Sequence, residues 1–210
     1  MRVVAGSGVV RDYRQAEIDR HIDMVSRFVE RAREGGEAPL AITLILRSAN
    51  SAPARALIYK KNELIGAGIR AKAILAKLEP EAELRDLFAG LSELAPREKP
   101  SELIRWARNP RLLDAHEQAT YGTAMCWSGD PMRRDADKRN ALALFDEAES
   151  DRVRLARLAF TALWSASAAV PERLLLGLAT RKPSGAYHAS PDAPVTVLRQ
   201  SVQGWPLLRH

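Results

Sequence analysis

Apolar positions near the start of the chain follow first a helical and then a strand spacing. Between residues 14 and 33 they recur every three or four positions with charges between them, which predicts an amphipathic helix that Gly35 and Gly36 terminate. The next run, residues 40–46, is almost wholly apolar and rich in β-branched side chains. Such a run is typical of a strand covered on both faces, so we expect a central strand here.

A helix and a second strand are predicted next. Asn50 or Ser51 can cap the helix, and the glycines of segment 66–68 end it. Residues 69–78 then alternate between two faces, which favours a strand. A strand, a crossover helix and a second strand form a right-handed unit, so the two strand segments should be adjacent and parallel.

The rest of the chain predicts shorter elements. In order, we expect a helix opened by Pro80, a short strand over 103–107, strands over 112–121 and 123–127, a helical signal from about 135 that breaks near 146–150 and resumes over 153–164, and one or two helical turns over 171–179. The two strands that meet at Gly122 should be antiparallel, because their link is so short.

These elements predict an α/β fold with a mixed, mainly parallel sheet flanked by helices. We divide the chain into an N-terminal helical segment, 1–36, an α/β domain with C-terminal helices, 37–180, and an irregular tail, 181–210. The tail is rich in Pro, Gly and Ser and shows no sustained period.

The composition of the 210-residue chain bears on its cellular location and on the sites it can hold. The single cysteine, Cys126, excludes an internal disulfide, so a cytoplasmic location is expected. The longest apolar run is far shorter than the ~20 residues that a membrane helix needs, and residues 1–4 are too few for a signal peptide, so we expect no membrane span. Four scattered histidines lack metal-ligand spacing, so no metal or cofactor is expected. One of them, His21, should lie on a solvated helix face.

Charge is distributed unevenly. The net charge is +6, and the stretch from Arg47 to Lys77 holds seven basic residues against one acid, Glu63. This stretch either faces an anionic partner such as a nucleic acid or forms ordinary solvated surface. The tryptophans Trp106, Trp127 and Trp164 fall inside predicted elements, which favours core positions over a stacking platform.

A histidine-centred segment follows the short strand over 103–107. Residues 115–123 read AHEQATYGT, and residues 124–132 read AMCWSGDPM. Together with the order of elements over 38–168, this text resembles one catalytic repeat of the phospholipase D superfamily. In that family a strand carries His-x-Lys-x-x-x-x-Asp, and a Gly-Ser-x-Asn segment ends the next strand. The resemblance implies a phospholipase D-like repeat with no cofactor.

The resemblance can be followed residue by residue. His116 matches the family's nucleophile, Gln118 stands where the phosphate-binding lysine belongs, and Thr123 stands where the aspartate belongs. Ser128 lies near the Gly-Ser position, without the family's asparagine. A lost charge contact of this kind typically costs ~2.7–4 kcal/mol of barrier stabilisation, so any activity should be strongly weakened.

Two further residues enter the predicted site. Arg133 and Arg134 follow the last of these strands, near the strand ends where ligands of α/β sheets tend to lie. We predict that Arg133, Arg134 and His116 form an anion site, and that Gln118 and Ser128 also contact the anion. The structural alternative is that the two arginines form a salt bridge to Asp130 or Asp135. Single-repeat members of the resembled family also imply a homodimer.

Three functions stay open from the sequence. The first is non-catalytic binding of an anionic, phosphate-containing ligand, a nucleic acid or a protein partner. The second is a working phosphodiesterase or nuclease that uses His116 as nucleophile. The third is a structural interaction module, in which the charge pattern is incidental.

Overall fold

The computed structural model describes residues 7–35, 40–113, 116–130, 143–147 and 151–177. Within these ranges the centre is a seven-stranded sheet in the order β6-β5-β4-β1-β2-β3-β7. In that order the strands span Ala143–Asp146, Met125–Gly129, Glu117–Tyr121, Ala41–Leu46, Arg70–Leu75, Ile104–Trp106 and Ala168–Ala169. The expected mixed α/β sheet flanked by helices is confirmed.

The sheet is not mainly parallel, however. The pairs β1–β2 and β2–β3 are parallel, whereas β1–β4, β4–β5, β5–β6 and β3–β7 are antiparallel. The expectation was wrong because β4, β5 and β6 join the sheet on the far side of β1 and alternate in direction. The β4–β5 link is a tight turn in which Gly122 has a positive φ of 60°, and so short a link forces antiparallel pairing.

The parallel core of the sheet agrees with the sequence. β1 and β2 are adjacent and in register from Ala41 opposite Arg70 to Leu46 opposite Leu75. Helices α2 (Ala52–Tyr59) and α3 (Lys61–Gly66) form the crossover between them. The crossover ends at Gly68, whose φ of +68° favours a residue without a Cβ atom.

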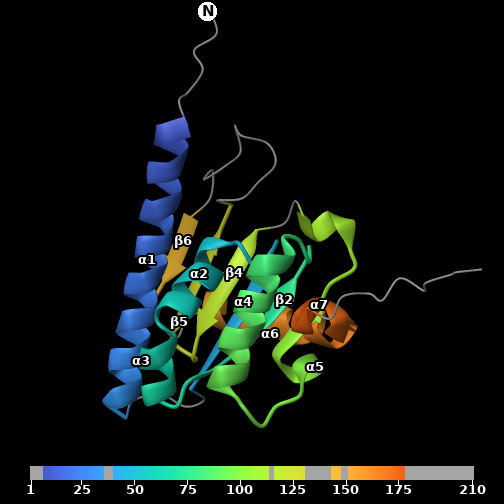
Figure 1. Cartoon of the computed structure of the whole chain (residues 1–210). Coiled ribbons are helices and arrows are strands. Elements are labelled where there is room, and N and C mark those ends of the chain that lie inside the picture. Colours follow the sequence, from blue (N-terminus) through green and yellow to red (C-terminus); the bar gives the residue numbers. More distant parts are fainter. Residues whose placement is uncertain (1–6, 36–39, 114–115, 131–142, 148–150, 178–210) are drawn as a thin grey trace, which may run out of the picture. The chain divides into compact units, whose positions relative to one another are not determined.

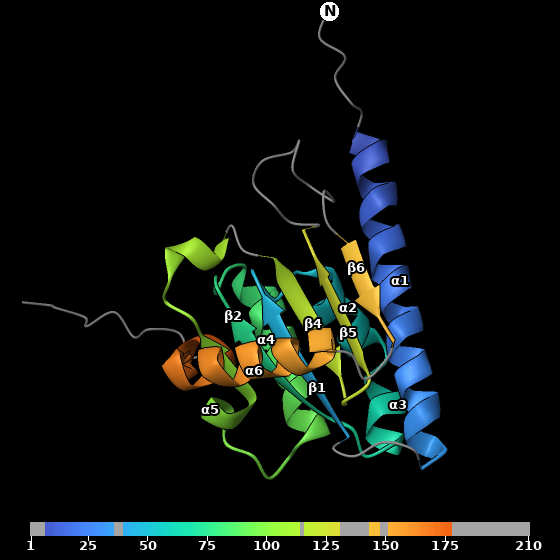
Figure 2. The ribbon, with the colours of Figure 1, turned by 180° about the vertical axis from the view of Figure 1, so that it is seen from behind.

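Helices cover the two faces of the sheet unequally. Helices α1 (Ser7–Arg33), α2, α3 and α4 (Glu81–Leu94) lie on the face shown in Figure 1. Helix α6 (Asp151–Ala166) crosses the opposite face, which Figure 2 shows. Strand β1 follows this division, because Ile42, Leu44 and Leu46 are buried in the main core while Thr43 and Ile45 point toward the α6 face.

One buried residue of α1 contradicts the sequence analysis. His21 was expected in solvent but is fully buried, with its ring edge-on to Trp127 at 4.4 Å between centroids. It shares a helix face with Val25 and Phe28, which stand four and seven residues later and are also buried. Helical spacing therefore decides its environment, and the polar neighbours in sequence do not. Trp127 is a core residue as expected, while Trp106 and Trp164 are only half-buried.

The C-terminal part of the described chain needs one correction. Residues 143–146 were assigned to a helical signal but form strand β6. Pairing with the outer edge of β5 satisfies their backbone N–H and C=O groups, and this tertiary pairing outweighs the local preference for a helix. Helix α6 and the short α7 (Glu172–Leu176) match the expected helices. Residues 135–142 and the tail 181–210 lie outside the described residues.

Several strand ends meet at one edge of the sheet, which we call the carboxyl edge. Strands β1, β2 and β3 end there, at Leu46, Leu75 and Trp106. Antiparallel β4 begins there and β5 ends there. The short α5 (Pro100–Leu103) leads into β3, and a 3-10 turn over Pro110–Leu113 links β3 toward β4. Ligands of open α/β sheets bind outside such an edge.

Candidate functional site

A histidine and an aspartate meet at the carboxyl edge. Glu117 of β4 pairs with Gly129 of β5, so the next pair outward places His116 opposite Asp130. The His116 Nδ1 atom contacts the Asp130 Oδ1 atom directly. The His116 side chain is 46% exposed and the Asp130 side chain 1% exposed. A buried carboxylate thus holds one nitrogen of a ring whose body still reaches solvent.

This contact determines which nitrogen of the His116 ring is available to a ligand. An ionised carboxylate only accepts hydrogen bonds, so Nδ1 of His116 donates to Asp130. The other ring nitrogen, Nε2, is then available to a ligand: it accepts when the ring is neutral and donates when the ring is protonated. The same arrangement can orient a nucleophile or an anion-binding group.

A second carboxyl group, Glu117, is buried beside this pair. Its Oε1 atom accepts hydrogen bonds from the backbone N–H of Arg47, at 2.9 Å, and from the Ser51 hydroxyl. Ser51 stands at the N-cap position of α2, as the sequence predicts, but its hydroxyl binds Glu117 and does not cap the helix. The Glu117 Oε2 atom is buried and has no hydrogen-bond partner among the described residues.

The electrostatics of Glu117 follow from this position. Burial raises the pKa of its carboxyl above the usual range, and the nearby Asp130 charge acts in the same direction. The hydrogen bonds from Ser51 and from the Arg47 backbone, together with the Arg47 charge, oppose that rise in pKa. Glu117 is therefore a buried acid that resists ionisation next to the His116–Asp130 pair.

A small cavity adjoins all of these groups. It is lined by Arg47, His116 and Glu117 together with six apolar residues, Ile45, Leu46, Ile74, Ala76, Ala107 and Leu112. Its volume is about 10 Å³, close to the space that one water molecule needs. The cavity is too small for an organic ligand, so a ligand would lie on the outer side of His116.

Two residues predicted to bind the anion, Gln118 and Ser128, do not lie beside His116 at the carboxyl edge. The Gln118 side-chain amide donates to the Ala156 carbonyl of α6 at 2.8 Å. Ser128 lies directly opposite Gln118 on the same sheet face, inward from the edge. Gln118 therefore anchors α6 to the sheet and is not directed at a ligand of His116.

Thr123 also lies away from His116. It belongs to the turn after β4, where the backbone N–H of Gly122 donates to the carbonyl of Ala41 at the opposite edge of the sheet. Strand β4 separates the two residues by roughly 13 Å of extended chain. Thr123 thus cannot orient the imidazole, and Asp130 holds it instead. Arg133 and Arg134 lie outside the described residues.

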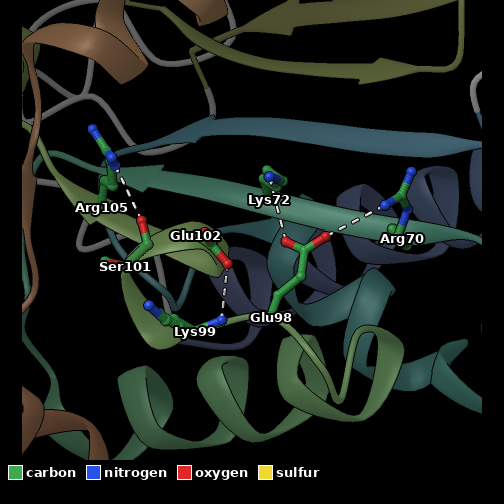
Figure 3. Close-up of polar contacts among 7 residues, drawn as sticks. All are labelled: Arg70, Lys72, Glu98, Lys99, Ser101, Glu102 and Arg105. Atoms are coloured by element: carbon green, nitrogen blue, oxygen red, sulfur yellow. Dashed lines mark hydrogen bonds and ion pairs between the residues drawn. The ribbon is translucent and has the colours of Figure 1, made fainter.

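The basic stretch from Arg47 to Lys77 does not form one surface. Its helical part covers the face of Figure 1, whereas the Lys72 side chain reaches Trp164 of α6 on the other face, with its Nζ atom 5.6 Å from the ring centroid. Figure 3 shows Glu98 between Arg70 and Lys72, with ion-pair distances of 3.4 and 3.3 Å. Acids likewise pair with three other basic residues of the stretch, Lys60, Lys61 and Lys77.

The sequence patterns did not indicate Asp130 as the partner of His116, or Glu117 as a buried acid near that pair. Asp130 was considered only as a salt-bridge partner of arginines. The antiparallel pairing across Gly122 is the signal that could have found Asp130, since counting outward from that turn brings residues 116 and 130 together.

Among the described residues, no group of three or more His, Cys, Asp or Glu side chains could hold a metal ion. The helices in this part of the chain are all too short or too polar to cross a membrane. Comparison of the chain with protein-family models, with curated proteins and with solved structures found no significant match.

Proposed function

We propose that this protein binds a phosphate-containing anion at the carboxyl edge of its sheet, through His116, without turning the ligand over. The observation that carries the proposal is the His116–Asp130 contact, which leaves a half-exposed ring with one nitrogen available. A protonated imidazole that donates from Nδ1 to a carboxylate still has its Nε2–H for an anion.

Nearby positive charge supports an anionic ligand. Leu112 lines the same cavity as His116, and its neighbour Arg111 is exposed. Ala107 lines this cavity too, and Arg108 beside it is also exposed. No carboxylate of the described residues forms an ion pair with Arg108 or Arg111. By contrast, Glu117 and Asp130, the acids that the described residues place near His116, are buried.

The absence of turnover rests on what replaces the lysine of the resembled phospholipase D family. Gln118 carries no charge, and its amide is engaged with the Ala156 carbonyl. A phosphoryl transition state needs positive charge placed where negative charge develops. Without that lysine, the histidine retains a binding role more readily than a catalytic one.

Isothermal titration with inorganic phosphate tests the proposal. We expect saturable binding by the wild type, loss of detectable binding in His116→Ala, and a weakening of at least about tenfold in Arg111→Ala, since hydrogen bonds to charged groups contribute ~1.5–3 kcal/mol. Arg70→Ala is the matched control, because Arg70 is an exposed arginine at the start of β2, at the opposite edge. Equal affinity in wild type and His116→Ala would refute the proposal.

A second candidate is a working phosphodiesterase with His116 as nucleophile. One observation favours it: Asp130 supplies the orienting carboxylate that the sequence seemed to lack at Thr123. A neutral ring held at Nδ1 would attack phosphorus through the Nε2 lone pair, which forms a phosphohistidine as the ester oxygen leaves. Cleavage of a generic phosphodiester by the wild type, abolished by His116→Ala, would favour this function over pure binding.

A further inference from the structure

A groove lies beside the candidate anion site, around the end of β2. Its lining residues are Ala76, Lys77, Leu78, Glu79, Glu81, Trp106 and Leu174, and its volume is about 340 Å³. This volume falls within the range of small-molecule sites, which starts near ~300 Å³. Ala76 lines both this groove and the small cavity next to His116. The groove and the anion site therefore meet at the carboxyl edge.

An aromatic ring and a cation characterise the groove. Trp106, the last residue of β3, is only half-buried. The Arg108 guanidinium lies over its ring, with Cζ 4.9 Å from the centroid. Leu78 and Leu174 add apolar surface to the lining. A flat ring and aliphatic side chains at a ligand-binding edge are suited to a planar, apolar group.

The charges of the groove set the orientation of a ligand. Glu79 and Glu81 line the groove and are exposed; Lys77 pairs with Glu79 at 3.4 Å, and Arg85 pairs with Glu81 at 3.3 Å. The two carboxylates still accept hydrogen bonds from amino groups of a ligand, which a phosphate does not offer. Arg111, with which no acid of the described residues forms an ion pair, stands next to Leu112, which lines the small cavity beside His116. A phosphate belongs at the His116 end, and an amino-bearing ring belongs in the groove.

We propose that the ligand is a phosphate ester of a planar, amino-bearing aromatic ring, such as a purine nucleotide, whose ring occupies the Trp106 groove. This inference rests on the proposed function for the phosphate end, while the groove itself is an independent feature of the structure. Trp106 determines specificity for the ring, and His116 contacts the phosphate.

Four probes separate the two ends of the site: AMP, ribose 5-phosphate, adenosine and inorganic phosphate. By titration calorimetry, we expect AMP to bind roughly 5- to 150-fold more tightly than ribose 5-phosphate, the range that stacking of one base on an aromatic side chain provides. Trp106→Leu should reduce the AMP affinity to that of ribose 5-phosphate. Trp106→Phe should keep most of the preference, and neither variant should alter inorganic phosphate binding.

The outcomes distinguish the inference from the function on which it rests. Adenosine binding that Trp106→Leu removes would support the groove even if inorganic phosphate fails to bind. Equal affinities of the wild type for AMP and ribose 5-phosphate would overturn the inference while leaving phosphate binding intact. A Trp106→Leu variant that melts like the wild type yet keeps the preference for AMP would overturn it as well.

Discussion

The ring of His116 and the carboxylate of Asp130, fourteen residues apart in sequence, meet at the carboxyl edge of the sheet through the antiparallel register of β4 and β5. Asp130 is buried and His116 is half-exposed, so the carboxylate positions a ring that a ligand can reach. The pair forms without Gln118, whose amide binds the Ala156 carbonyl, and without Thr123, which lies at the opposite edge of the sheet.

Asp130→Asn should weaken phosphate binding by roughly tenfold. The amide keeps the size of the carboxyl group but removes the charge that makes its hydrogen bond to the imidazole strong. Titration calorimetry measures the affinity, and thermal melting checks that the fold is intact. An Asp130→Asn variant that binds phosphate as tightly as the wild type would show that the pair does not position the ring.

In the wild type, ionisation of buried Glu117 should lower the free energy of unfolding as pH rises. Glu117→Gln should remove this pH dependence. Burial raises the pKa of Glu117 in the folded state above its value of 4.5 in the unfolded chain. Above pH 4.5 the unfolded chain therefore releases this proton before the native state does, so native stability falls as pH rises through the folded pKa. Urea unfolding of both proteins from pH 4.5 to 8 measures the difference, and parallel curves would contradict this role.

His21 should have the opposite effect at acidic pH. Burial, with a smaller contribution from the Arg20 charge, lowers its pKa from 6.5 to about 3. The unfolded chain takes up this proton below pH 6.5 while the native state stays neutral, so stability falls as pH drops toward 3, by ~1.4 kcal/mol per unit at most. His21→Gln should flatten this acid limb in the same unfolding series. If the free energy of unfolding of His21→Gln falls with acid as steeply as that of the wild type, other groups cause the fall.

Gln118→Lys combined with Thr123→Asp should not create phosphodiesterase activity. The first change removes the hydrogen bond to the Ala156 carbonyl, and the second places a carboxylate at the opposite edge of the sheet. The variant should instead lose ~1 kcal/mol of stability, the usual contribution of one hydrogen bond. Gln118→Ala is the matched control for that loss. A gain in diester cleavage by the double variant would show that this account of Gln118 is wrong.

The parallel centre of the sheet could be predicted from the sequence because its signals are local. The apolar run predicts β1, the polar residues before Pro53 mark the start of α2, and the glycines at 66 and 68 mark the end of α3 before β2. The antiparallel side is harder to predict, since β6 forms only by pairing with β5 and its own residues carry a helical pattern. Direction and partner of such a strand depend on the rest of the sheet.

The candidate site was predicted in part. His116 could be singled out because the sequence around it resembles a family motif, but its partners depend on register and burial, which a motif does not encode. Glu117 is a case in point: its carboxyl group takes hydrogen bonds from Ser51 and the Arg47 backbone, more than sixty residues earlier. Likewise, Trp106 could be placed in a strand but not beside a groove, because the groove is formed by segments distant in the chain.

Phosphate binding by His116 is tested most directly by following the histidine ring signals in the NMR spectrum of the ¹⁵N-labelled protein. If His116 binds phosphate, its ring signals shift and saturate as inorganic phosphate is added, while those of His21, buried beside Trp127, stay in place. The His116→Ala variant assigns the responding signals. His116 signals that remain unchanged up to millimolar phosphate, in a protein whose spectrum shows it folded, would contradict the central claim.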